Sequence, residues 1–186
     1  RATQGEPALS WWSYVVTPDF AGAVLENWQS EFLQFSFFVL ATVWLVQRGS
    51  NESKPVGDAG LGTDAEQRVG MYAGEDAPRW ARSSGVRLRL YENSLLLVMG
   101  AIFAASWVGQ SLGNWRSYNE ELRDDRQAEI GWTTYVRLAD FWEKTLQNWQ
   151  SEFLAVGTMV VFTIYLRQRG SPESKPVGMP HAETTN

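Results

Sequence analysis

A seven-residue sequence, NWQSEFL, occurs twice in this chain and constrains its architecture more than any other feature. It covers residues 27–33 and returns at residues 148–154, an offset of 121 positions. The match extends well beyond these letters, because residues 27–57 and 148–178 are identical at 20 of 31 positions. Each copy runs from NWQSEFL through an apolar block into a QRGS sequence, so the chain contains an internal duplication.

Each copy predicts one long helix with an aromatic residue at one end and a cation at the other. The distance from tryptophan to arginine is about 20 residues, or ~30 Å at 1.5 Å per residue, which matches the hydrocarbon core of a bilayer. Tryptophan and arginine at the two ends are typical of interface anchors. We therefore expect transmembrane helices at about 28–47, from Trp28 to Arg48, and at about 149–168, from Trp149 to Arg169. The strictly apolar cores are short enough that buried helices of a soluble bundle are the alternative.

A third apolar block, at about 93–114, carries no ionisable residue and is the clearest transmembrane candidate. Trp115 follows it as a further interface anchor. Small residues recur along the block every four positions, which predicts a face for close helix packing in lipid. These residues are Ala101, Ala105, Gly109 and Gly113.

Basic residues flank the three blocks unequally and predict the topology. Arginine and lysine gather after both repeat helices and before the middle one, which the positive-inside rule assigns to the cytoplasm. Residues 47–92 and 167–186 are then cytoplasmic, and both repeat helices run in the same direction. The expected fold is all-α, a helical membrane protein with three transmembrane helices from a parallel duplicated two-helix unit whose first helix is missing.

The same pattern predicts four successive regions. They are a first repeat at 1–57, a flexible cytoplasmic linker at 58–89, a second repeat at 90–178 and a disordered tail at 179–186. The linker is expected because its Gly, Asp, Ser and Glu residues lack a sustained apolar period. In the repeated QRGS tails, the arginines and Lys54 and Lys175 are expected to hold the helix ends by attraction to anionic lipid. A docking motif for a cytoplasmic partner is the alternative.

Composition excludes several classes of function. A net charge of −5 and a pI near 5.0 disfavour nucleic-acid binding, which needs a basic face. The chain has no cysteine, so disulfides and thiolate metal sites are excluded. His181 stands alone near the end of the chain, and no ordered spacing of acidic residues suggests a metal site. We expect no catalytic residues, no metal, no cofactor and no enzymatic activity.

Two carboxylates are the main candidates for a functional role. Glu31 and Glu152 lie one turn inside the outer tryptophans, and an acid at that depth should face protein or water. Gln110 lies at similar depth on the middle helix and can pair with Glu152, while Gln34 adds polar surface nearby. The sequence therefore predicts a polar membrane patch at the outer mouth of the bundle. Snorkelling, or a hydrogen bond to a neighbouring helix, is the structural alternative.

The strings LYENSLLLVMGAIF, GQSLGNWRSYNEE, NWQSEFL and RQRGSPESKPV resemble a family of small bacterial integral membrane proteins of unknown function. The resemblance covers residues 90–178 well and residues 11–57 as a half-unit. The main departure from the family pattern is that the opening helix of the first half-unit is absent. It implies a bacterial cytoplasmic membrane location and no known activity.

Two functional hypotheses follow. The first is a structural or envelope-associated helical bundle that has the lipid bilayer as its partner, with a homo-oligomer or a cytoplasmic protein at the linker as further partners. The second is a small proton- or cation-coupled transporter or channel in which Glu31 and Glu152 titrate. Parallel repeats occur in some transporters, although three or four spans leave little room for a central cavity.

Overall fold

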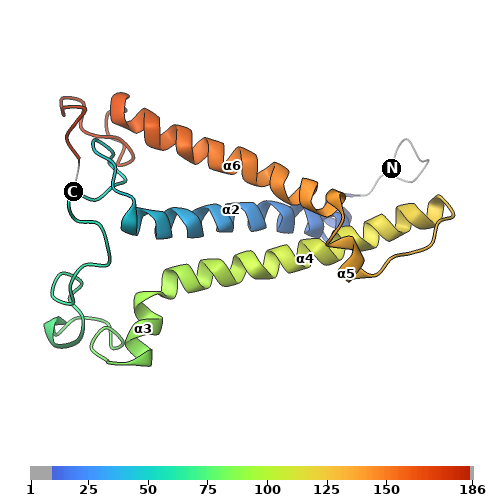
Figure 1. The fold of residues 1–186 in the computed structure, drawn as a ribbon, viewed down its shortest axis with the longest axis horizontal. Helices are drawn as coiled ribbons and strands as arrows, with labels where there is room; N and C mark the ends of the chain where they lie inside the picture. Colours follow the sequence, from blue (N-terminus) through green and yellow to red (C-terminus); the bar gives the residue numbers. More distant parts are fainter. Residues whose placement is uncertain (1–9, 185–186) are drawn as a thin grey trace. The chain divides into compact units, whose positions relative to one another are not determined.

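Three long helices and several short ones, joined by turns and loops, make up the computed structural model, which describes residues 10–184 apart from the side chains of Pro18 and Asp19 (Figure 1). The segments are α1 (Trp11–Val15), α2 (Pro18–Trp44), the 3-10 helix η2 (Gly70–Tyr72), α3 (Val86–Glu92), α4 (Ser94–Asp124), α5 (Trp132–Tyr135) and α6 (Ala139–Tyr165). No strand occurs among these described residues, so the predicted all-α class is confirmed.

The chain divides into two compact units. The first unit contains residues 1–32 and 102–150, and the second contains residues 33–101 and 151–186. Each of the three long helices, α2, α4 and α6, contributes residues to both units. Of the helices in the described residues, α4 alone has the length and composition that a membrane crossing requires.

The duplication reappears in the helix bounds. Helices α2 and α6 each contain 27 residues, and both ends of α6 lie 121 positions after those of α2. The short helices α1 and α5 begin at the same offset. Both long helices begin about ten residues before the predicted spans, because the polar segments before Trp28 and Trp149 continue each helix, as their apolar spacing predicts.

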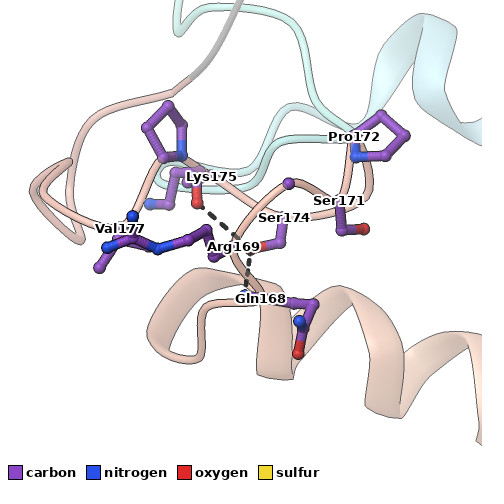
Figure 2. A pocket seen from close by; sticks show the side chains of 9 residues that line it. Gln168, Arg169, Ser171, Pro172, Ser174, Lys175 and Val177 are labelled. Atoms are coloured by element: carbon purple, nitrogen blue, oxygen red, sulfur yellow. Dashed lines mark hydrogen bonds between the residues drawn. The ribbon is translucent and has the colours of Figure 1, made fainter.

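Both repeat helices end three residues earlier than predicted, and the following loops explain why. In the first loop the Ser53 hydroxyl accepts a hydrogen bond of 2.7 Å from the Gln47 amide, and in the second the Ser174 hydroxyl accepts one of 2.8 Å from the Gln168 amide. Figure 2 shows the second of these bonds. Because a serine side chain takes up this amide, the helical ladder stops before it.

The two lysines of the QRGS loops are turned inward rather than toward a lipid surface. The Lys54 ammonium donates to the Gly60 carbonyl. The Lys175 side chain is 1% exposed, and its three donors meet the carbonyls of Pro180, His181 and Glu183 at 3.3, 2.8 and 3.1 Å. The three bonds of Lys175 leave its ammonium group no proton for a lipid phosphate, because such a group has only three protons to donate. Lys54 uses one donor in this way.

The C-terminal segment is held by these contacts. Besides the bonds from Lys175, the Thr184 hydroxyl accepts from the Gly49 amide at 3.1 Å, and the Arg167 guanidinium donates to the Met179 carbonyl at 3.0 Å. Residues 179–184, which the sequence predicts to be a disordered tail, supply carbonyls to the buried Lys175 and the half-buried Arg167. The rest of that predicted tail, 185–186, lies outside the described residues.

The predicted flexible linker, 58–89, is instead a series of hydrogen-bonded turns. Its start is tied to α2, because the Gly60 amide donates to the Val43 carbonyl at 2.7 Å. Farther along, the Gly70 amide donates to the Ala81 carbonyl at 2.8 Å, and Val69 and Ala81 are buried. Side-chain and turn hydrogen bonds thus give this glycine-rich segment a defined path that its composition alone does not indicate.

Candidate functional site

Burial in this protein is the reverse of that in a typical water-soluble domain. If glycines are left aside, twelve of the buried residues in the described part of the chain are polar or charged. Only four are hydrophobic: Val69, Ala81, Tyr135 and Phe141. Large apolar side chains on the long helices are exposed, such as Phe37 at 54%, Leu97 at 50% and Phe162 at 53%. Since buried polar groups are rare in water-soluble proteins, this pattern is informative.

The most enclosed polar side chains gather in the first unit. Gln29, Gln110 and Thr145 are each 0% exposed. The indole N–H of Trp149 donates to the Gln29 side-chain oxygen at 2.7 Å. Together with Trp107 these residues are called the polar cluster: Gln29, Trp107, Gln110, Thr145 and Trp149.

Several groups of the polar cluster have no hydrogen-bond partner within the described residues. Both the amide nitrogen and the amide oxygen of Gln110 are unpaired, as are the Thr145 hydroxyl, the Gln29 amide nitrogen and the Trp107 indole nitrogen. A buried polar group left unpaired costs about 1–3 kcal/mol. This many unpaired buried groups within one unit would be satisfied by a small hydrogen-bonding partner.

Ring contacts join α4 and α6 of the first unit around the polar cluster. The Trp107 ring lies 5.9 Å from Phe141 and stacks at 6.0 Å on Phe103, which in turn lies 6.4 Å from Trp149. Gln110 follows Trp107 by three residues and Thr145 follows Phe141 by four, so each lies one helical turn from these contacts.

Helix α2 approaches α4 closely at a glycine. A side-chain carbon added at Gly109 would lie 2.8 Å from a methyl carbon of Leu25, so the absence of a side chain permits this contact. Gln29 follows Leu25 by four residues and lies on the same face of α2. Gly109 thus allows the backbone approach that brings Gln29 to the polar cluster.

Charged groups border the polar cluster. Glu26, which precedes the apolar part of α2, accepts a hydrogen bond of 3.2 Å from the Asn148 amide. Burial raises the pKa of the Glu26 carboxyl, and nearby Lys144 and the Asn148 bond oppose that rise. Lys144 itself lies 3.2 Å from Asp140. Acidic and basic side chains thus occupy the border, while the polar cluster is built from amides, a hydroxyl and indoles.

Tyr135 connects this border to the buried aromatic rings. It is fully buried and its hydroxyl donates to Asp140 at 2.9 Å. Burial is the largest cause that raises the pKa of Tyr135, and the bond to Asp140 adds to it. Tyr135 is therefore a neutral hydrogen-bond donor at neutral pH.

The four residues of the predicted polar patch have different environments. Gln110 and Gln34 are buried, Glu152 is half-buried and Glu31 is exposed. Gln110 and Glu31 belong to the first unit, whereas Gln34 and Glu152 belong to the second. Gln110 is one of the residues of the polar cluster, and its side chain makes no hydrogen bond to Glu152 or to any other described residue.

Sequence reasoning missed Gln29, Trp107 and Thr145. Gln29 lies within the repeated NWQSEFL, and its place directly after Trp28 was the available signal. Thr145 follows Phe141 by one helical turn, on the face that packs inward. Neither signal distinguishes a buried polar residue from an exposed one, because the partner helix must be known first.

The predicted anchors have mixed environments. Arg48 and Arg169 are exposed, and Trp28 is 48% exposed, as an interface anchor would be. Trp149 and Trp115 instead donate inward, the latter to the Ile130 carbonyl at 2.8 Å. These two indoles therefore serve contacts within the first unit.

Only part of the predicted small-residue stripe packs within this chain. Gly109 contacts Leu25, and nothing lies within 4 Å of a side-chain carbon added at Gly113. Ala101 and Ala105 are exposed. Within the first unit Gly109 therefore packs against α2, and packing along the rest of the stripe stays a prediction.

The second unit contains a cavity beside the QRGS loop, but no cluster of metal ligands occurs in the described part of the chain. The loop from Gln168 to Val177 lines a cavity of about 600 Å³ (Figure 2). Within residues 10–184 no group of three or more His, Asp or Glu side chains could hold a metal ion. The Lys175 ammonium donates its protons to C-terminal carbonyls. It therefore has no donor left for a ligand in this cavity.

Comparison with known proteins gives a family but no activity. No curated protein and no solved structure matches the chain. A family model matches residues 1–186, the full length of the sequence. The chain therefore belongs to the family described as Domain of unknown function (DUF6766).

Proposed function

We propose that this protein is a multi-pass membrane protein with three spanning helices, α2, α4 and α6, and that it acts as a non-enzymatic helical bundle in the bacterial cytoplasmic membrane. The observation that carries the proposal is the reversed burial, with polar side chains inside and large apolar side chains outside. Exposed apolar side chains have a lower free energy in contact with lipid than in contact with water, so this surface suits a bilayer.

The properties of the helices support this proposal. The apolar window of α4 has a mean hydropathy of 1.7 and is only 17% buried, although a core helix of a soluble protein would be mostly buried. Helices α2 and α6 each contain 27 residues, which is ~40 Å at 1.5 Å per residue and exceeds the ~30 Å hydrocarbon core. In both helices the polar NWQSE segment precedes the apolar part, so each proposed crossing includes this polar turn.

Single-cysteine labelling in intact cells tests the three crossings. The chain has no cysteine, so each substitution reports alone. Exposed positions serve best, because Ser53 and Ser174 hold the ends of the QRGS loops through their hydroxyls. The four variants are Ser13→Cys, Ser84→Cys, Ser117→Cys and Ala182→Cys, all at exposed residues.

The labelling pattern separates one crossing from three. With three crossings, a membrane-impermeant thiol reagent labels Ser13→Cys and Ser117→Cys but not the other two. If α4 alone crosses, Ser117→Cys and Ala182→Cys label together while Ser13→Cys behaves like Ser84→Cys. Equal labelling of all four in cells, with no protein in the membrane fraction, contradicts the proposal.

A second candidate function is the passage of protons or small cations, and the unpaired groups of the polar cluster favour it. Gln110 is the best residue for a test, because Met matches its shape without its donors and acceptor. In reconstituted vesicles we expect a proton or potassium flux that Gln110→Met lowers about tenfold or more, as for loss of one buried hydrogen-bonding group.

Two comparisons make this flux test specific. Gln127→Met makes the same change at an exposed residue and should leave the flux unchanged. Glu31→Gln combined with Glu152→Gln tests whether the carboxylates titrate in the passage. A wild-type flux no greater than that of protein-free vesicles eliminates this candidate.

A further inference from the structure

The region between α2 and α4 has a pronounced division of charge. From residue 58 to 78 it carries the acidic side chains Asp58, Asp64, Glu66, Glu75 and Asp76 against one arginine. From residue 79 to 92 the balance reverses to four arginines and one acid, Glu92. Residues 79–92 are called the arginine segment, and its arginines are Arg79, Arg82, Arg87 and Arg89.

The four cations of the arginine segment are free of partners. All four side chains are exposed, and none makes a hydrogen bond or ion pair within the described residues. Other cations of the chain are used internally, such as Lys175 on three carbonyls and Arg123 at 3.0 Å from Glu129. The arginine segment thus presents its charge outward, although acidic residues are abundant just before it.

Exposed apolar side chains are interspersed with these arginines. Trp80 is 50% exposed, Val86 71%, Leu90 47% and Tyr91 38%. On α3, Val86 and Leu90 are one turn apart with Arg87 beside them, while Leu88 is half-buried on the other side. Aromatic and aliphatic groups alternating with arginine suit a membrane-water boundary, where rings and stems enter lipid and guanidinium groups meet phosphates.

The chain holds the arginine segment next to α4. Helix α3 ends at Glu92, Asn93 caps it, and α4 begins at Ser94, so α3 and α4 are consecutive (Figure 1). Ala81 is buried and accepts from Gly70, which fixes the beginning of the segment. The segment therefore has little freedom to move away from the apolar end of α4.

We propose that the arginine segment is a docking surface for anionic phospholipid headgroups of the cytoplasmic leaflet, with Arg82, Arg87 and Arg89 binding their phosphates and Trp80, Val86 and Leu90 inserted between the lipids. Charge complementarity carries this inference, since a guanidinium pairs with a phosphate through two parallel hydrogen bonds. It rests on the proposed membrane location. Lys175 does not serve as such a cation, because its three donors are taken by carbonyls.

Lipid retention by the full chain tests this surface. The protein is reconstituted in bilayers of phosphatidylcholine with a minor share of phosphatidylglycerol and extracted in mild detergent, and the retained lipids are quantified by mass spectrometry. The test variant is Arg82→Gln with Arg87→Gln and Arg89→Gln. The control is Arg116→Gln with Arg126→Gln and Arg137→Gln, three exposed residues of the predicted outer side.

We expect wild-type protein to retain phosphatidylglycerol in preference to phosphatidylcholine. The ratio of the two retained lipids should fall about fivefold or more in the test variant and stay unchanged in the control. High salt should reduce the wild-type preference in the same direction. Equal retention by both variants overturns the inference while leaving the membrane proposal intact. Alkaline extraction that releases wild-type protein from the bilayers overturns both, because the chain is then not inserted.

Discussion

Gly49 and Gly170 occupy the same place in the two QRGS loops but have different surroundings. Both adopt a φ of +85°, a left-handed conformation that favours glycine. A side-chain carbon added at Gly49 would lie too close to the His181 carbonyl oxygen, at 2.2 Å, whereas nothing lies within 4 Å of one added at Gly170. The pair therefore separates the cost of backbone conformation from the cost of displacing the C-terminal segment.

We expect Gly170→Ala to lower the free energy of unfolding by roughly 1–2 kcal/mol, through left-handed strain alone. Gly49→Ala should lower it by about 1–3 kcal/mol more, because the added methyl group must displace residues 179–184. Thermal unfolding of purified protein in detergent measures both costs. Protease cleavage after Lys175 should accelerate in Gly49→Ala alone, and equal stability and cleavage in the two variants would show that the C-terminal segment does not pack on Gly49.

At the scale of elements, much of the helical architecture could be predicted from the apolar blocks. The three blocks became α2, α4 and α6, and the outward continuation of both repeat helices was correct. The helix ends were wrong by three residues, because Ser53 and Ser174 bind backbone amides that sequence periodicity assigns to the helix. A serine six residues ahead is not a recognised stop signal, so only the folded loop reveals it.

The candidate site was harder to predict than the helices. Gln110 was identified only as a partner for Glu152, because the two residues lie at similar depth in their helices. Gln29 and Thr145 are equally buried, but they lie in polar surroundings in the sequence, where nothing signals enclosure. Their burial arises from contacts among three helices, such as Leu25 against Gly109, which periodicity within one helix does not encode.

At the scale of the whole molecule, reversed burial predicts an unusual response to surface mutation. Leu40 and Val161 occupy equivalent positions of the two repeats, and each is 48% exposed. On the surface of a water-soluble protein, a change to Asp would alter stability by at most about 0.5 kcal/mol and would improve solubility. In a membrane-spanning helix the same change costs about 2–3 kcal/mol, because a carboxylate on so short a side chain cannot reach the interface.

We therefore expect Leu40→Asp and Val161→Asp each to reduce the membrane fraction that resists alkaline extraction, and both together to abolish it. Leu61→Asp is the matched control, since Leu61 is 69% exposed but lies in the region between α2 and α4. That variant should insert like the wild type. If Leu40→Asp, Val161→Asp and the double variant instead appear as folded protein in the soluble fraction, the exposed apolar faces do not contact lipid. A second protein surface must then cover them.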